Sequence, residues 1–115
     1  MRRGDVVQFN LPPPVGGAGR EQTGQRPAIV IQSNASAANL ATVVVVPVTS
    51  EMTALRFPGA IRLTPTATNG LADESVALIH QVRAIDKRRS LGPRGQLSPE
   101  ELYQVEESLK GLLGF

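Results

Sequence analysis

The polar stretch that precedes an apolar run near residue 28 contains the residues best suited to phosphate chemistry. It reads Arg-Glu-Gln-Thr-Gly-Gln-Arg-Pro over residues 20–27. Pro27 restricts the backbone of the residue before it, so Arg26 is expected to be fixed where a loop meets a strand. A guanidinium stays charged and can donate two parallel hydrogen bonds to phosphate oxygens. The pattern is compatible with phosphoryl transfer, and pairing of Arg26 with a surface carboxylate is the alternative.

Two hydroxyl side chains, Thr49 and Ser50, follow the apolar run at residues 42–48. At a strand end they could orient a phosphate or donate to developing negative charge. Capping of a turn is the simpler interpretation when these two residues are taken alone.

His80 is the only histidine and lies in the apolar stretch at residues 75–83. Histidine side chains titrate near neutral pH and can transfer a proton, although a single strand histidine is often structural. Strict alternation would place Leu78 and His80 on one face of a strand and Gln81 on the other. The basic run at residues 87–89 is either a solvated surface or a set of phosphate contacts.

The composition excludes several kinds of site. The chain has no cysteine, which excludes disulfides, zinc–thiolate centres and a cysteine nucleophile. Its acidic residues are scattered, so no metal site is expected, and no cofactor-binding glycine motif is complete. A net charge of +2 and a pI near 9.7 are compatible with nucleic acid. Aromatic residues, at 3%, are too few for large base-stacking platforms.

The elements that would position these side chains are short strands followed by one helix. Strands are expected at residues 5–10, 27–32, 42–48, 60–63 and 75–83, with Pro27 as the first residue of its strand. A loop is expected at residues 11–26, and turns at 33–39 and 92–95. The strand at residues 42–48 is apolar on both faces and should be central.

The last part of the chain predicts a helix. Ser98 fits the N-cap, Pro99 the first turn and Glu101 the third position, which together form a capping box. Leucine and valine then recur at helical spacing at positions 102, 105, 109, 112 and 113. We therefore expect one mostly β (α+β) domain over residues 1–115, a small, partly open barrel. No apolar run reaches the roughly 20 residues that a membrane helix needs, and no secretory signal is present, so a cytoplasmic protein is expected.

Four ordered motifs resemble those of the MazF/PemK toxins. They are Arg-Gly-Asp-Val-Val (3–7), Glu-Gln-Thr-Gly-Gln-Arg-Pro-Ala-Ile-Val (21–30), Val-Pro-Val-Thr-Ser (46–50) and His-Gln-Val-Arg-Ala-Ile-Asp-Lys-Arg-Arg (80–89). The resemblance implies a small SH3-like barrel with a C-terminal helix, assembled as a homodimer. It also implies sequence-specific cleavage of single-stranded RNA, mainly messenger RNA, and inhibition by a cognate antitoxin of the MazE type.

Roles transfer from the family position by position. Arg26 would stabilise charge on the scissile phosphate, and Thr49 is the second expected catalytic residue. Gln22 and Ser50, with Arg20, Glu21 and Gln81, would line the RNA groove. Some relatives carry an Arg-x-Asp pair where this chain has Leu78 and His80, which excludes that version of the chemistry and leaves His80 as an acid, a base or an RNA contact.

The resemblance leads to a metal-independent mechanism in which the RNA 2′-hydroxyl attacks the adjacent phosphorus. The expected products carry a 2′,3′-cyclic phosphate and a 5′-hydroxyl. Two alternatives remain: a non-enzymatic toxin of the same fold that poisons gyrase, and an inactive RNA-binding module. The first uses a tryptophan-containing tail, whereas this chain has no tryptophan and ends at Phe115.

Overall fold

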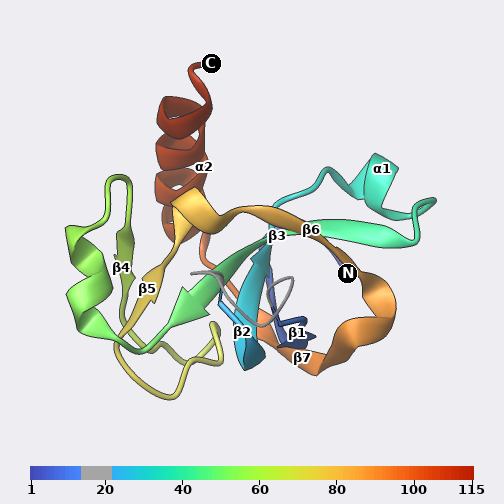
Figure 1. Cartoon of the computed structure of the whole chain (residues 1–115), viewed down its shortest axis with the longest axis horizontal. Coiled ribbons are helices and arrows are strands. Elements are labelled where there is room, and N and C mark those ends of the chain that lie inside the picture. The colour runs from blue at the N-terminus through green and yellow to red at the C-terminus, as the bar shows by residue number, and fades with distance from the viewer. Residues whose placement is uncertain (14–21) are drawn as a thin grey trace.

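The strands of the protein form one antiparallel sheet. The structure, a computed structural model, describes residues 1–13 and 22–115. Within these residues the seven strands follow the order β4-β5-β3-β2-β1-β7, and β6 pairs with β3 (Figure 1). The strands are β1 (Asp5–Leu11), β2 (Gly24–Val30), β3 (Thr42–Thr49), β4 (Ile61–Leu63), β5 (Ser75–Ala77), β6 (Arg83–Asp86) and β7 (Ser90–Gln96). The helices are α1 (Asn34–Ala37) and α2 (Pro99–Leu113), with 3-10 turns η2 (Met52–Arg56), η3 (Ile79–Gln81) and η4 (Lys87–Arg89).

Five of the strands curl around an apolar interior. Strands β7, β1, β2, β3 and β6 are neighbours in the sheet, and alternate side chains of four of them meet in one buried cluster. The cluster comprises Val7, Phe9, Leu11, Ala28, Val30, Val43, Val45 and Ile85. This arrangement confirms the expected small barrel, with β3 as the central strand.

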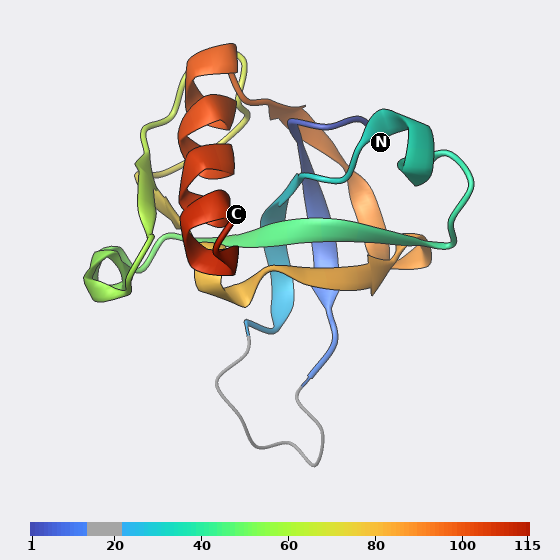
Figure 2. The ribbon, with the colours of Figure 1, turned by 90° about the horizontal axis from the view of Figure 1, so that it is seen from above.

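Helix α2 covers a second apolar cluster on the outer face of the sheet (Figure 2). Val105 is fully buried there, and Leu102 and Leu109 pack against the same cluster. The predicted stripe is wrong at its end, because Leu112 and Leu113 are exposed. The helix passes beyond the sheet at this point, so its last turn has no strand to pack against.

The start of α2 confirms the sequence prediction. The Ser98 side chain accepts from the Glu101 N–H at 3.1 Å, and the Glu101 carboxylate accepts from the Ser98 N–H at 2.8 Å. Gly114 ends the helix in the left-handed conformation, at φ 82°. In the part of the chain that the structure describes, neither helix has the length and apolar character needed to cross a bilayer.

The prediction of a single strand at residues 75–83 is wrong. Strand β3 pairs there with two separate strands, β5 opposite Val48 and Thr49 and β6 opposite residues 42–45. Pro47 lies between these two ladders and has no N–H to donate, so it cannot continue one ladder into the other. The turn η3 occupies the gap, and the N–H of Leu78 donates to the Pro47 carbonyl at 2.9 Å.

The turn expected at residues 92–95 is also wrong, because those residues belong to β7. This strand lies at the edge of the sheet and pairs with β1 through a register that shifts twice. Proline is tolerated at an edge or beside a bulge, which accounts for Pro93 inside the strand. Glycine and proline, which are typical of turns, therefore belong here to an irregular edge strand.

Two further boundaries differ from the prediction. Strand β2 begins at Gly24, so Pro27 is its fourth residue and the expected loop at 11–26 is shorter at both ends. Residues 24–27 pair with β1 on one side only among the described residues, and such an edge accepts proline. The turn at 33–39 contains the one-turn helix α1, which Ser33 caps.

Candidate functional site

The ends of β2 and β3 place Arg26 and Thr49 on the same face of the sheet. Ala28 and Pro47 form the last pair of the β2–β3 ladder, and Arg26 and Thr49 each lie two residues beyond this pair. Side chains of facing residues in a ladder point to the same side. Because side chains two residues apart along a strand share a face, Arg26 and Thr49 are expected on the face of that last pair, at one end of the barrel.

Arg26 is half-buried and is held by its own hairpin. Its Nε–H donates to the Thr23 carbonyl at 3.2 Å, which leaves the two terminal nitrogens for another acceptor. The residue borders a cavity of about 190 Å³ that Ser50, Gln25 and Arg94 also line. A cation and a hydroxyl that border one small polar cavity are suited to an anionic group.

Thr49 is almost completely buried, with 3% of its surface exposed. Its Oγ1 accepts from the Glu51 N–H at 3.2 Å, so the hydroxyl proton is still available as a donor. Its ladder partner Val76 packs against Ala54 and Leu78, which line a second and larger cavity. Thr49 thus pairs with a residue that packs against the wall of the larger cavity, and its chain neighbours Val48 and Ser50 line the smaller one.

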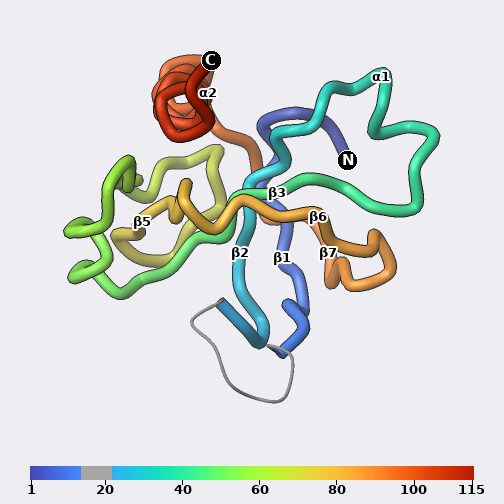
Figure 3. The backbone as a smooth tube through the Cα atoms, turned by 45° about the horizontal axis from the view of Figure 1, so that its top comes forward, coloured from blue at the N-terminus to red at the C-terminus, as the bar shows by residue number. Residues whose placement is uncertain are grey.

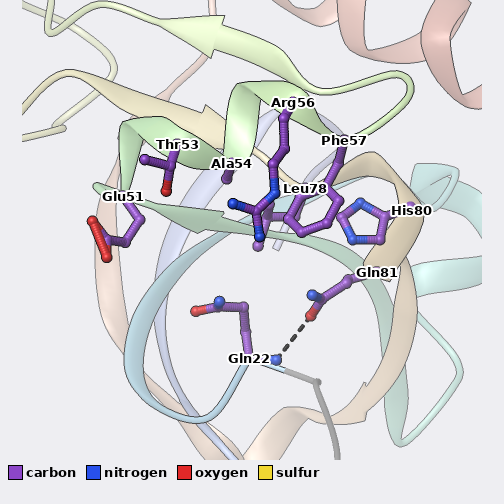
Figure 4. A pocket seen from close by; sticks show the side chains of 9 residues that line it. All are labelled: Gln22, Glu51, Thr53, Ala54, Arg56, Phe57, Leu78, His80 and Gln81. Carbon is purple, nitrogen blue, oxygen red and sulfur yellow. Dashed lines mark hydrogen bonds between the residues drawn. The ribbon is translucent and has the colours of Figure 1, made fainter.

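The larger cavity has a volume of about 450 Å³ and combines polar and apolar walls (Figure 4). Side chains from η2 and its flanking residues, from the segment 78–81 that contains η3, and from Gln22 just before β2 surround it. They are Gln22, Glu51, Thr53, Ala54, Arg56, Phe57, Leu78, His80 and Gln81. A cavity of this size and mixture could hold a planar polar group such as a nucleobase.

His80 forms part of a stacked row on one wall of the larger cavity. Its ring lies 4.6 Å from that of Phe57, with 41° between the planes, and the Arg56 guanidinium lies 4.9 Å from the Phe57 centroid. His80 Nδ1 is buried and has no hydrogen-bond partner within the described residues. Strict alternation around His80 proved wrong, because Leu78, His80 and Gln81 all line this cavity.

Gln81 connects the two walls of the larger cavity. Its side-chain oxygen accepts from the Gln22 N–H at 2.8 Å, as the dashed line in Figure 4 shows. Gln22, Gln81 and His80 are therefore grouped in one cavity, and Arg26 and Ser50 in the other. Arg20 and Glu21, the other two expected groove residues, lie outside the described residues.

Sequence reasoning missed several residues of the two cavities. Phe57 and Arg56 lie between the strands expected at residues 42–48 and 60–63, and Arg94 lies in a segment expected to be a turn. Arg94 donates to the Gln8 side chain and to the Gly70 carbonyl, each at 3.0 Å. The sequence signal that could have identified Arg94 is its place between two glycines in residues 92–95. The close approach of Gly70 to the Arg94 backbone, where a Cβ would lie 2.0 Å from the carbonyl oxygen, could not be read from the sequence.

The basic run at residues 87–89 is partly engaged within the molecule. The Arg88 side chain and backbone N–H both donate to Asp86, and they lower the pKa of that carboxyl to about 2. Reciprocally, the Asp86 carboxylate raises the pKa of Arg88. The Lys87 ammonium donates to the Ala37 carbonyl. In the described ranges, 1–13 and 22–115, no three acidic or histidine side chains gather closely enough to hold a metal ion.

Comparison of the sequence with known protein families identifies the relatives of this protein. The family of PemK-like, MazF-like toxins of type II toxin–antitoxin systems matches residues 2–113. The chain belongs to this toxin family. The matched residues thus contain the whole sheet, helix α2 and the residues that line both cavities.

Individual relatives of the MazF/PemK family agree with that assignment. The chain is 39% identical over 115 residues to the endoribonuclease MazF9 of Mycobacterium tuberculosis, covering 96% of this chain and 93% of the relative. It is 32% identical over 110 residues to the endoribonuclease EndoA of Bacillus subtilis, covering 96% and 91%. The crystal structure of MazF from Deinococcus radiodurans superposes with a TM-score of 0.81 at 30% identity, covering 100% of this chain and 97% of that one. A MazE–MazF structure from the same organism gives a TM-score of 0.74, also at 30% identity, covering 100% and 96%.

Proposed function

We propose that this protein is a metal-independent endoribonuclease toxin that cleaves single-stranded RNA, chiefly messenger RNA, at specific sequences. The proposal is supported by two observations: Arg26 and Thr49 lie two residues beyond the same end of the β2–β3 ladder, and Arg26 lines a small polar cavity together with the neighbours of Thr49, Val48 and Ser50. Two curated relatives at 32–39% identity are endoribonucleases, which supports the same activity here.

The proposed reaction begins with attack of a ribose 2′-hydroxyl on the neighbouring phosphorus. A bond forms between the 2′-oxygen and phosphorus while the bond from phosphorus to the 5′-oxygen breaks. The 2′-hydroxyl loses its proton to a base, and the leaving 5′-oxygen gains one. The products are a 2′,3′-cyclic phosphate and a 5′-hydroxyl, and the intramolecular geometry supplies a large proximity advantage.

Each site residue has a role in this reaction. The free terminal nitrogens of Arg26 would bind the phosphate oxygens, and the Thr49 hydroxyl would donate to the charge that develops on them. Ser50 borders the cavity next to Arg26 and would bind a phosphate oxygen as well. His80 lines the neighbouring cavity and is our candidate for the acid or base.

The larger cavity would take a base next to the scissile phosphate. The rings of Phe57 and His80, tilted by 41° to each other, offer aromatic surface for stacking. The amide of Gln22 offers donors and an acceptor for a base edge, and Gln81 beside it is a further proposed RNA contact. Arg20 and Glu21, which precede β2 in the sequence, complete the proposed RNA contacts.

The assembly and the setting form part of the proposal. We infer a cytoplasmic homodimer, with a cognate antitoxin of the MazE type occupying the RNA groove. The MazE–MazF structure from Deinococcus radiodurans supports an antitoxin partner for a protein of this fold.

The proposal is tested by mapping the ends produced from a long transcript by purified, antitoxin-free protein. We expect cleavage at a recurring short sequence, with 2′,3′-cyclic phosphate and 5′-hydroxyl ends, at the same rate with and without EDTA. Loss of cleavage in EDTA would show a metal mechanism. Intact RNA together with inhibited gyrase supercoiling would identify the non-enzymatic alternative, and RNA binding without turnover would identify the inactive module.

A further inference from the structure

The backbone that leads into β2 is anchored by side chains from another part of the chain. Residues 24–27 pair only with β1 among the described strands, and Gln22 and Thr23 precede the strand altogether. Backbone groups of such a segment need other partners, because no ladder satisfies them. Those partners come from the segment that follows β5.

Gln81 and Arg83 hold the two backbone polar groups of Gln22. The Gln81 side-chain oxygen accepts from the Gln22 N–H at 2.8 Å, and Arg83 Nη1 donates to the Gln22 carbonyl at 3.4 Å. The Gln81 side chain provides the acceptor that the Gln22 N–H needs, and the Arg83 side chain provides the donor that the Gln22 carbonyl needs. Both side chains are half-buried, and Arg83 takes part in no ion pair of the described residues.

The next residue connects this anchor to the guanidinium of the site. The Thr23 carbonyl accepts the Nε–H of Arg26 at 3.2 Å. A shift of the segment at Gln22 would move that acceptor and change the direction of the terminal nitrogens of Arg26. Catalysis by fixed charges depends steeply on such placement, and a displacement near 1 Å can cost about a hundredfold in rate.

We propose that Gln81 and Arg83 are positioning residues that act through the Gln22–Thr23 backbone to orient Arg26. The inference rests on the proposed ribonuclease function and adds to it two side chains that need not touch the reacting atoms. Arg83 is separated from Gln22 by 61 positions in the sequence, and the end of β5 brings it there through η3.

The kinetic test compares Arg83→Met with Arg62→Met in single-turnover RNA cleavage. Arg62 is an exposed arginine of β4 that pairs with Glu74, so it provides a matched loss of charge away from both cavities. For Arg83→Met we expect the rate at saturating RNA to fall by roughly 10- to 100-fold, with KM and the salt dependence of binding unchanged. A rise in KM with a salt slope lower by about one, at an unchanged rate, would show a direct phosphate contact and overturn the proposal.

Two further measurements keep the result interpretable. The Arg26 Nε–H resonance, assigned with Arg26→Lys, should shift and exchange faster with water in Arg83→Met and in Gln81→Met but not in Arg62→Met. The resonance is measured without RNA, so it tests the positioning role separately from the ribonuclease activity. A natural protein that cleaves no RNA would contradict the proposed function, and the resonance would still test the positioning of Arg26. In an Arg26→Ala background, Arg83→Met should cost no further activity. An unmoved resonance, or a full additional loss in the double variant, would contradict the proposal.

Discussion

Arg26 combines a constrained backbone with a partly satisfied guanidinium. Pro27 follows it, the Thr23 carbonyl accepts its Nε–H, and the residue borders a small polar cavity. The type and position of this residue were predictable, because the Arg-Pro pair is local in the sequence. Its connection to Gln81 and Arg83 was not, because the hydrogen bonds span 59 and 61 positions.

Replacing Arg26 by alanine should remove activity while leaving the fold intact. Loss of one preorganised donor to a developing charge typically costs a hundred- to a thousandfold in rate, or about 3–4 kcal/mol. The side chain is half-buried and makes one hydrogen bond to the backbone within the described residues, so the thermal midpoint should change little. Cleavage rates and thermal unfolding of Arg26→Ala, with Arg62→Ala as the control, check both statements. A folded variant with full activity would contradict the assignment.

The Asp86 carboxylate should contribute to stability in a defined pH range. Its pKa is lowered from the ordinary value of 3.8 to about 2, first of all by hydrogen bonds from Arg88. A carboxyl with a lowered pKa in the folded protein stabilises the fold above pH 4 and loses that contribution as the pH falls toward 2. Its side chain is about a third exposed, at 34%, so the effect should be small.

Asp86→Asn should therefore be less stable than the natural protein at pH 6, and the difference should shrink between pH 4 and pH 2. Urea titrations at several pH values provide the measurement. Asp73→Asn is the control, because that carboxylate forms no ion pair in the described part of the chain. A difference that grew on acidification would have the wrong sign for this explanation.

Strand β3 is the element that brings the site together. It pairs with β2 on one side and with β5 and then β6 on the other, and Pro47 separates the last two (Figure 3). Its apolar composition predicted its central place, and the motif of residues 98–101 predicted the start of α2. The break at residues 78–82 was not predictable from periodicity, because it depends on a proline in the neighbouring strand. The same break brings His80 and Gln81 into one cavity.

Removing the cap of α2 should weaken the fold without affecting the site. Ser98→Ala deletes one partner of the reciprocal capping pair with Glu101 and should cost about 1 kcal/mol of unfolding free energy. Urea denaturation measures the loss, and Glu107→Gln on the exposed face should stay within about 0.5 kcal/mol of the natural protein. RNA cleavage at low temperature should be unchanged in both, since neither residue lines a cavity described above.

For the molecule as a whole, an apolar barrel fixes the ends of β2 and β3, and residues at these ends line the smaller of the two cavities. The barrel class followed from short strands and one late helix, and the family motifs agreed with it. The residues that line each cavity were not predictable from either, because they are distant in sequence. The larger cavity is lined from η2, η3 and the segment before β2, and the smaller one from β1, β2, β3, β7 and residues 71–73. The Phe57–His80 stack shows how two isolated residues become a surface only after folding.

The most direct measurement uses an RNA with one ribose replaced by deoxyribose on the 5′ side of the mapped cut. The proposed nucleophile is absent from that strand alone, while every contact with the protein except one hydroxyl remains. We predict normal binding, no cleavage at the modified position and unchanged cleavage of the all-ribose strand in the same reaction. Cutting of the modified strand at that position would contradict 2′-hydroxyl attack and require another nucleophile.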